Sequence, residues 1–164
     1  MKLVFKVREP ATFFHYLESI SLWSIHTRKK VHEHYKKRCG ISAEEEGLLK
    51  EYTNIRKKYQ WRSLDSDFYL AKDFKEAHAH IKKRLTKEEY ETLSKIIKHF
   101  RPQIHSIWIE WKELLLRRKK QLEKEQKKHN LKALFEDIID FYEAEDVPKE
   151  TTVHLLVNPI EKNS

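Results

Sequence analysis

The sequence is poor in glycine, with only Gly40 and Gly47 among its 164 residues. A dinucleotide-binding fingerprint and a phosphate-binding P-loop both need several glycines, because the backbone must approach phosphate closely. The nucleophile elbow of the α/β-hydrolases needs a glycine on each side of its serine, and no serine here has both. The sequence therefore excludes these three kinds of site from its own residues.

Cysteine is also scarce, since Cys39 is the only one. A single cysteine forms neither an intramolecular disulfide nor a cysteine-based zinc finger, and it agrees with a reducing compartment. No apolar run reaches the roughly 18 residues of a membrane span. Lys6, Arg8 and Glu9 interrupt the N-terminus before the apolar core of a signal peptide could form. We therefore expect a cytoplasmic protein with no membrane partner and no cofactor.

The chain is rich in charge, and the positive sign dominates. It has 34 Lys and Arg against 26 Asp and Glu, which gives a formal net charge of +8. A basic balance favours anionic partners, such as nucleic acid or an acidic protein surface. The longest basic cluster supplies the candidate contacts for such a partner: Arg117, Arg118, Lys119, Lys120, Lys124, Lys127 and Lys128. Beside other clusters, Tyr35, Tyr59 and Trp61 are candidates for stacking on exposed bases.

Hydrophobic periodicity predicts a mainly α protein of about six helices in an irregular bundle, with two short terminal strands that can pair. The expected helices run from Pro10 to about Gly40, over 42–59, 70–85 and 86–100, from Pro102 onwards, and over about 131–143. The expected strands are 2–7 and 151–157. We treat residues 1–164 as a single helical domain that could be the N-terminal part of a larger protein.

Local signals mark the expected helix starts. Proline is tolerated at the first helical position, where its missing N–H costs nothing, so Pro10 and Pro102 each predict a start. Ser42 with Glu45, and Thr86 with Glu89, have the spacing of capping boxes, in which serine or threonine and glutamate each satisfy a free amide.

The apolar pattern fails after Leu116, because residues 117–129 contain only one apolar side chain, Leu122. This stretch keeps helix propensity but has little to bury, so we expect a helical arm that is solvated or covered by a partner. Trp108 and Trp111, by contrast, lie at helical spacing and are expected in the core. The two strands pose a separate problem, because a two-stranded ribbon is marginal unless something packs on it or extends it.

Metal binding is a weaker hypothesis. Asp73, Glu76 and His80 share one helix face and could supply ligands, but a second ligand-bearing helix would be needed. The only candidate for it is an acidic column on the last expected helix: Glu136, Asp140 and Glu143. We prefer solvated faces for both groups, with Glu76 interacting with neighbours on its own helix.

The second half of the sequence carries a family resemblance. It runs through Leu85 to Glu89, Lys98 to Pro102, Ile107 with Trp108, Phe141 with Tyr142, and Val153 to Pro159. This order resembles the region upstream of the catalytic helix in some uncharacterised zincin-like metallopeptidases. The resemblance covers about residues 85–159 and implies a helical N-terminal part that leads into further strands and a zinc helix. The chain has no HExxH motif, so no catalytic or metal-binding residue is carried over.

Three functions remain open at this point. The chain is either the non-catalytic helical portion of a larger hydrolase-like protein, a basic nucleic-acid-binding helical module, or a scaffold that docks an acidic partner. A partner could also be the remainder of the same polypeptide or a second copy of the chain. The sequence contains no complete catalytic motif and leaves open whether the protein is an enzyme.

Overall fold

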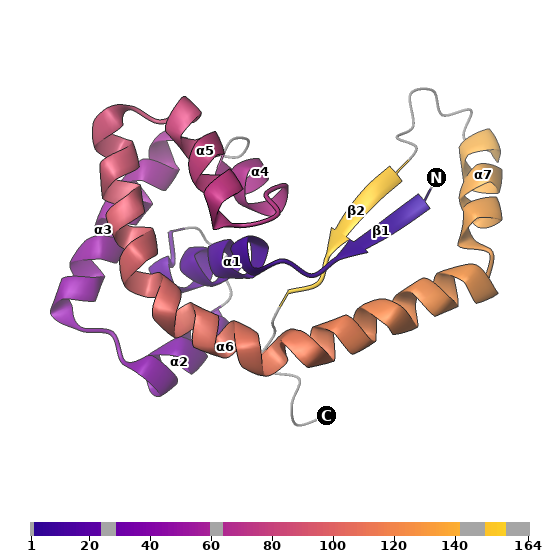
Figure 1. Ribbon diagram of the computed structural model, residues 1–164, viewed down its shortest axis with the longest axis horizontal. Helices are drawn as coiled ribbons and strands as arrows, with labels where there is room; N and C mark the ends of the chain where they lie inside the picture. Colours follow the sequence, from indigo (N-terminus) through magenta and orange to yellow (C-terminus); the bar gives the residue numbers. More distant parts are fainter. Residues whose placement is uncertain (1, 24–28, 60–63, 142–149, 157–164) are drawn as a thin grey trace. The chain divides into compact units, whose positions relative to one another are not determined.

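The computed structural model describes residues 2–23, 29–59, 64–141 and 150–156, and these form a mainly α-helical protein (Figure 1). The elements are, in chain order, β1 (Lys2–Lys6), α1 (Glu9–Ser21), α2 (Lys29–Cys39), α3 (Ala43–Lys58), α4 (Leu64–Tyr69), α5 (Phe74–Arg84), α6 (Lys87–Lys128), α7 (Leu131–Phe141) and β2 (Glu150–His154). The expected fold class, mainly helical with two short strands, is thus confirmed.

The described residues fall into two compact units, and each is considered by itself. The helical unit comprises Arg8–Glu110. The strand unit comprises the described parts of Met1–Val7 and Trp111–Leu155, and it therefore includes the second part of α6.

The helix expected from Pro10 to about Gly40 is in fact two helices, α1 and α2. Helix α1 has Pro10 in its first turn, and it ends because Leu22 adopts a left-handed backbone conformation with φ 48°. The apolar stripe continues across the break, since Phe13 and Ile20 of α1 and Val31 of α2 are all buried. Periodicity alone could not reveal the break, because both helices bury the same kind of face.

The expected helix over 70–85 also starts too early. Asp73 is the N-cap of α5, and its Oδ1 accepts the backbone N–H of Glu76 at 2.9 Å. Leu70, the first residue of the expected helix, lies between α4 and α5 and is 59% exposed. The N-cap residue comes directly before the first helical residue, so α5 begins after Asp73 and does not include Leu70.

Helix α6 passes through Pro102 without a break, so the prediction that Pro102 starts a new helix is wrong. A proline inside a helix removes one backbone hydrogen bond and costs about 3 kcal/mol. Here the apolar stripe is buried on both sides of the proline, at Ile97, Phe100 and Ile104. Burial of such side chains contributes about 1.5–3 kcal/mol each, which is enough to carry the helix through the proline.

Both predicted capping boxes are present. Glu45 N–H donates to Ser42 Oγ at 3.2 Å, and Ser42 N–H donates to the Glu45 carboxylate at 2.8 Å. Thr86 and Glu89 make the same reciprocal pair at 3.3 and 3.0 Å. These contacts fix the starts of α3 and α6 within the helical unit.

A buried arginine joins three helices of the helical unit. Arg56 of α3 is 1% exposed, and its guanidinium donates to Glu18 of α1 at 2.8 Å and to Asp65 of α4 at 2.8 Å. It also lies over the ring of Trp23, 4.4 Å from the centroid. Tyr52 of α3 donates its hydroxyl to the same Glu18 carboxylate. The buried guanidinium therefore has two carboxylates and an aromatic ring as partners.

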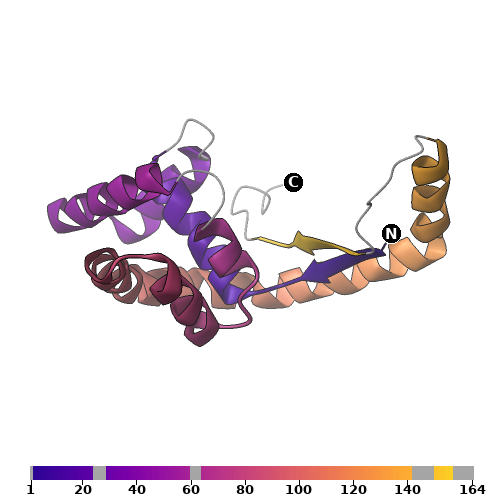
Figure 2. The same cartoon turned by 90° about the horizontal axis from the view of Figure 1, so that it is seen from above.

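In the strand unit, β1 and β2 pair in parallel, with Lys2 opposite Glu150 and Lys6 opposite His154 (Figures 1 and 2). The strands come from opposite ends of the sequence, as expected, and they form a two-stranded sheet. Leu134 of α7 is 50% exposed, so not every apolar side chain of this helix is buried.

We predict that Arg56→Ala destabilises the protein by about 3–5 kcal/mol, because it leaves the Glu18 carboxylate shielded from water without its cation. Lys57→Ala is the matched control, since Lys57 is the exposed neighbour on the same helix, and its effect should stay within about 0.5 kcal/mol. Urea unfolding followed by circular dichroism measures both. Equal effects of the two variants would contradict the role given to Arg56.

A second prediction concerns acid. Hydrogen bonds from Lys58 and Tyr59, both at 2.6 Å, lower the pKa of Glu89 from 4.5 to about 2. A depressed folded-state pKa contributes stability above the unfolded value, and this contribution is lost as the pH falls towards about 2. Glu89→Gln should therefore flatten the loss of stability between about pH 4.5 and pH 2, while Glu88→Gln should leave it unchanged. Thermal unfolding across that pH range gives the comparison, and identical profiles for the two variants would contradict it.

Candidate nucleic-acid interface

Three arginines from the basic clusters of the helical unit pair with carboxylates of the same unit. Arg38 donates to Glu110 at 2.8 Å, and Arg84 donates to Asp67 at 2.8 Å. Arg56 is the buried arginine described above. These side chains already have anionic partners, so a phosphate would have to compete with carboxylates for them.

The aromatic residues proposed for base stacking are not available as a set. Tyr35 is completely buried, so its predicted role as an exposed stacking platform is wrong. The Tyr59 hydroxyl donates to a carboxylate at 2.6 Å, and Trp61 lies outside the described residues. Trp108 and Trp111 are each 6% exposed, which confirms their expected place in the core. The described residues therefore do not bring these three aromatic side chains together as a stacking platform.

The basic arm at 117–128 forms the C-terminal part of helix α6. At 3.6 residues per turn, five of its cations fall within about 100° of the helix circumference. We call these five residues the cationic stripe: Arg117, Lys120, Lys124, Lys127 and Lys128. All five are exposed. The arm therefore has one strongly basic face rather than a uniform coat of charge.

The other two predicted contact residues lie off this face. Arg118 donates to Gln121 at 3.1 Å, and Lys119 pairs with Glu123 at 3.7 Å. Within the part of the chain that the structure describes, the five cations of the stripe form no ion pair with a carboxylate. The structure thus separates the seven predicted residues into five unpaired cations on one face and two with neighbours of their own. Helical spacing was the signal that could have shown this division in the sequence.

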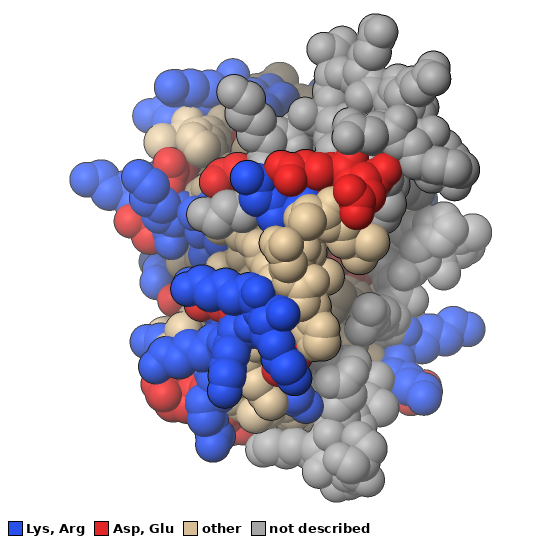
Figure 3. Space-filling view, turned by 90° about the vertical axis from the view of Figure 1, so that its right-hand side faces the viewer, with Lys and Arg blue, Asp and Glu red and all other residues tan. Residues whose placement is uncertain are grey.

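The stripe is also costly to the helix that carries it. Lys120 and Lys124 are four residues apart, as are Lys124 and Lys128, and like charges at this spacing destabilise a helix by about 0.2–0.5 kcal/mol per pair. Figure 3 shows Lys and Arg side chains grouped on an exposed surface. Such charges are tolerated there because water solvates them. Lys127 and Lys128 lie in the last turn of α6, where cations favour the helix dipole, but no ion pair within the described residues explains the alignment of all five.

The described residues do not support the metal-binding hypothesis. Across the described ranges, no group of three or more His, Cys, Asp or Glu side chains could hold a metal ion. Asp73 and Glu76 are used at the start of α5, where Glu76 also accepts the backbone N–H of Lys72 at 2.6 Å. The side chains of Asp140 and Glu143 lie outside the described residues.

Comparison with known proteins adds no relative: no family model, no curated protein and no solved structure matches the chain. The resemblance to zincin-like metallopeptidases therefore stays a prediction. Among the described helices, none is both long enough and apolar enough to span a membrane.

Proposed function

We propose that the chain is a basic helical module that binds nucleic acid through the cationic stripe of α6. One observation carries the proposal: five exposed cations lie on one face of twelve helical residues, without ion pairs among the described residues. Because the alignment costs helix stability, an anionic partner that neutralises it would turn repulsion into attraction.

The dimensions of the stripe suit a phosphate backbone. Eleven residue steps separate Arg117 from Lys128, which is about 16 Å at a rise of 1.5 Å per residue. One strand of B-DNA carries a phosphate about every 3.4 Å along the helix axis, so the stripe spans about five phosphates. A duplex also accepts a single α-helix in its major groove, which is about 12 Å wide. The contacts would go to phosphates, which position a protein without reading the base sequence.

The surroundings of the stripe favour nucleic acid over other anionic partners. Binding to an anionic membrane surface requires an apolar face beside the basic one. The only apolar side chain at 117–128 is Leu122, which lies about 120° or more around the helix from every stripe residue. A specific acidic protein partner is expected to bring aromatic or apolar anchors into contact, and the exposed face of the stripe offers none.

The direct test compares two triple variants that remove the same charge. Lys120→Gln, Lys124→Gln and Lys127→Gln remove three stripe cations, whereas Lys112→Gln, Arg118→Gln and Lys119→Gln remove three exposed or half-exposed cations off the stripe. With duplex DNA at low salt, the stripe variant should bind at least about tenfold more weakly than the control variant, since three phosphate contacts are lost. Fluorescence anisotropy measures both affinities.

The stripe variant should stay within about 0.5 kcal/mol of the unchanged protein in stability, because all three substituted side chains are exposed and unpaired within the described residues. Equal weakening by the two variants would mean that net charge alone governs binding and would overturn the proposal. If the protein bound poly-glutamate but not DNA, the partner of the stripe would be an acidic protein. If it bound anionic vesicles but not DNA, the partner would be a membrane surface.

A second candidate function rests on the sheet. Parallel sheets are normally buried within larger sheets, whereas β1 and β2 form a sheet of two strands in the described residues. We keep as a second proposal that this sheet is extended by strands of a larger hydrolase-like protein, of which the chain is the non-catalytic helical portion. Each strand pairs with the other along one edge, and its second edge is where another strand could pair.

The natural reading frame tests this second proposal. We expect the frame to continue beyond the codon for Ser164, with further strands and a helix that carries HExxH. A stop codon directly after Ser164 would contradict it, and it would leave the nucleic-acid proposal unaffected.

A further inference from the structure

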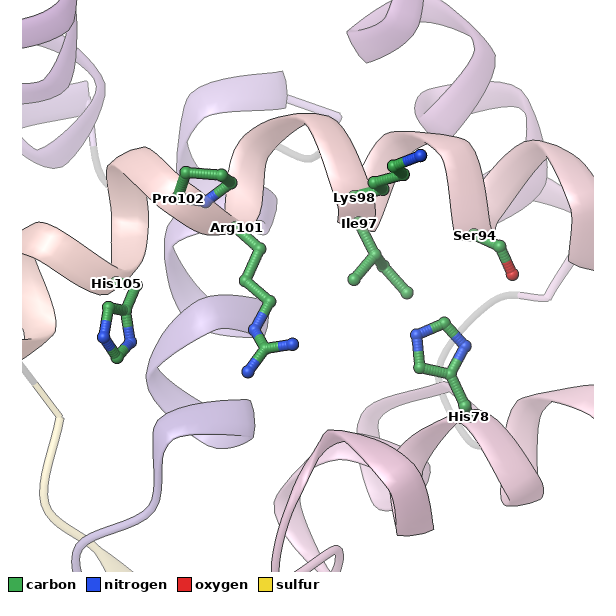
Figure 4. Close-up of a pocket in the computed structure, with 7 residues that line it drawn as sticks. All are labelled: His78, Ser94, Ile97, Lys98, Arg101, Pro102 and His105. Atoms are coloured by element: carbon green, nitrogen blue, oxygen red, sulfur yellow. The ribbon is translucent and has the colours of Figure 1, made fainter.

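A pocket of about 600 Å³ lies in the helical unit between α5 and α6 (Figure 4). Its volume is within the range of small-molecule sites, about 300–1,000 Å³. The lining comes from one residue of α5, His78, and from one face of α6: Ser94, Ile97, Lys98, Arg101, Pro102 and His105. In Figure 4, Ile97 and Arg101 point from α6 towards the side on which His78 lies, while the Lys98 ammonium points away from it.

The polar groups of this pocket are cationic or can donate hydrogen bonds. The Arg101 guanidinium lies over the ring of Phe74, 4.2 Å from its centroid, so the aromatic ring holds it in place. Glu9 is the carboxylate beside the pocket, 2.9 Å from His105 Nδ1 and 3.6 Å from Arg101 Nε. The contact with His105 is the shorter, and Arg101 has further N–H donors that Glu9 does not meet.

One of the lining residues, Ser94, has a hydroxyl without a hydrogen-bond partner in the described residues. Ser94 Oγ is shielded from solvent and has no hydrogen-bond partner within the described residues. His78 faces the same space from α5, and its ring packs edge-on against Tyr90 with centroids 6.1 Å apart. Burial, with a smaller contribution from the nearby Arg101 cation, lowers the pKa of His78. An anion between these groups would offset that repulsion.

We propose that this pocket binds a small phosphate monoester with an apolar organic group. Arg101 and Ser94 supply donors from α6 and His78 supplies one from α5, and three donor groups suit the three terminal oxygens of a phosphate better than the two oxygens of a carboxylate. Ile97 and Pro102 supply an apolar wall for the organic group. This inference does not depend on the cationic stripe, which belongs to the other unit.

Phenyl phosphate is the probe, with phenol and inorganic phosphate as the matched ligands that each lack one half of it. Titration calorimetry should give a Kd at or below about 1 mM for phenyl phosphate, with binding at least about tenfold weaker for either control ligand. Chemical-shift changes in NMR spectra should centre on Ser94 and His78. The stripe variant should bind phenyl phosphate as the unchanged protein does.

Arg101→Gln should weaken phenyl phosphate binding at least about tenfold, because the charged fork is lost. Lys95→Gln is the charge-matched control, exposed on the same helix but not part of the lining, and it should stay within about twofold. Ser94→Ala removes a hydroxyl that has no partner, so it should weaken binding without lowering the melting temperature. Equal effects of Arg101→Gln and Lys95→Gln, or phenol binding as tightly as phenyl phosphate, would overturn the proposal.

Discussion

The requirement that a charge withdrawn from water must be paired determines much of this structure. Arg56 meets it most completely: its guanidinium is buried between α1, α3 and α4 and is held by Glu18 and Asp65. Removing one partner of such a buried pair costs far more than the pair adds over apolar packing. Its ion pairs thus join α1, α3 and α4, and its guanidinium also lies over the rings of Phe14 and Trp23.

The arginines of the helical unit and the cations of the stripe differ in this respect. In the helical unit, Arg38, Arg56 and Arg84 each meet a carboxylate and serve the fold. On the end of α6, the stripe from Arg117 to Lys128 has no such partner among the described residues and stays in water. A net charge of +8 is by itself a weak argument for nucleic-acid binding. The alignment of charge on one helix face is a stronger one, because the lysines four residues apart repel one another and no ion pair within the described residues offsets that repulsion.

The sequence predicted the helices better than their ends. Residues that satisfy a local rule, such as the Ser42 and Thr86 capping boxes, behave as expected because their partners are three residues away. The break after Leu22 and the passage of α6 through Pro102 depend on packing against distant segments, which periodicity does not report.

The candidate sites show the same division. The stripe could have been predicted from the sequence, since its prediction needs only the assumption that 117–128 is helical. The pocket was not, because it brings His78 of α5 beside Ser94 and Arg101 of α6, and nothing local specifies how those helices meet. Tyr35 was misassigned for a related reason: a basic neighbourhood in the sequence does not reveal that an aromatic side chain faces the core.

The salt dependence of duplex DNA binding tests the central claim most directly. If the five stripe cations neutralise phosphates, log K should fall against log [salt] with a slope of about −4.5, because each contact contributes about −0.9. The stripe variant, with three of these cations removed, should have a slope of only about −2. A slope near zero for the unchanged protein, or equal slopes for the two proteins, would contradict the account.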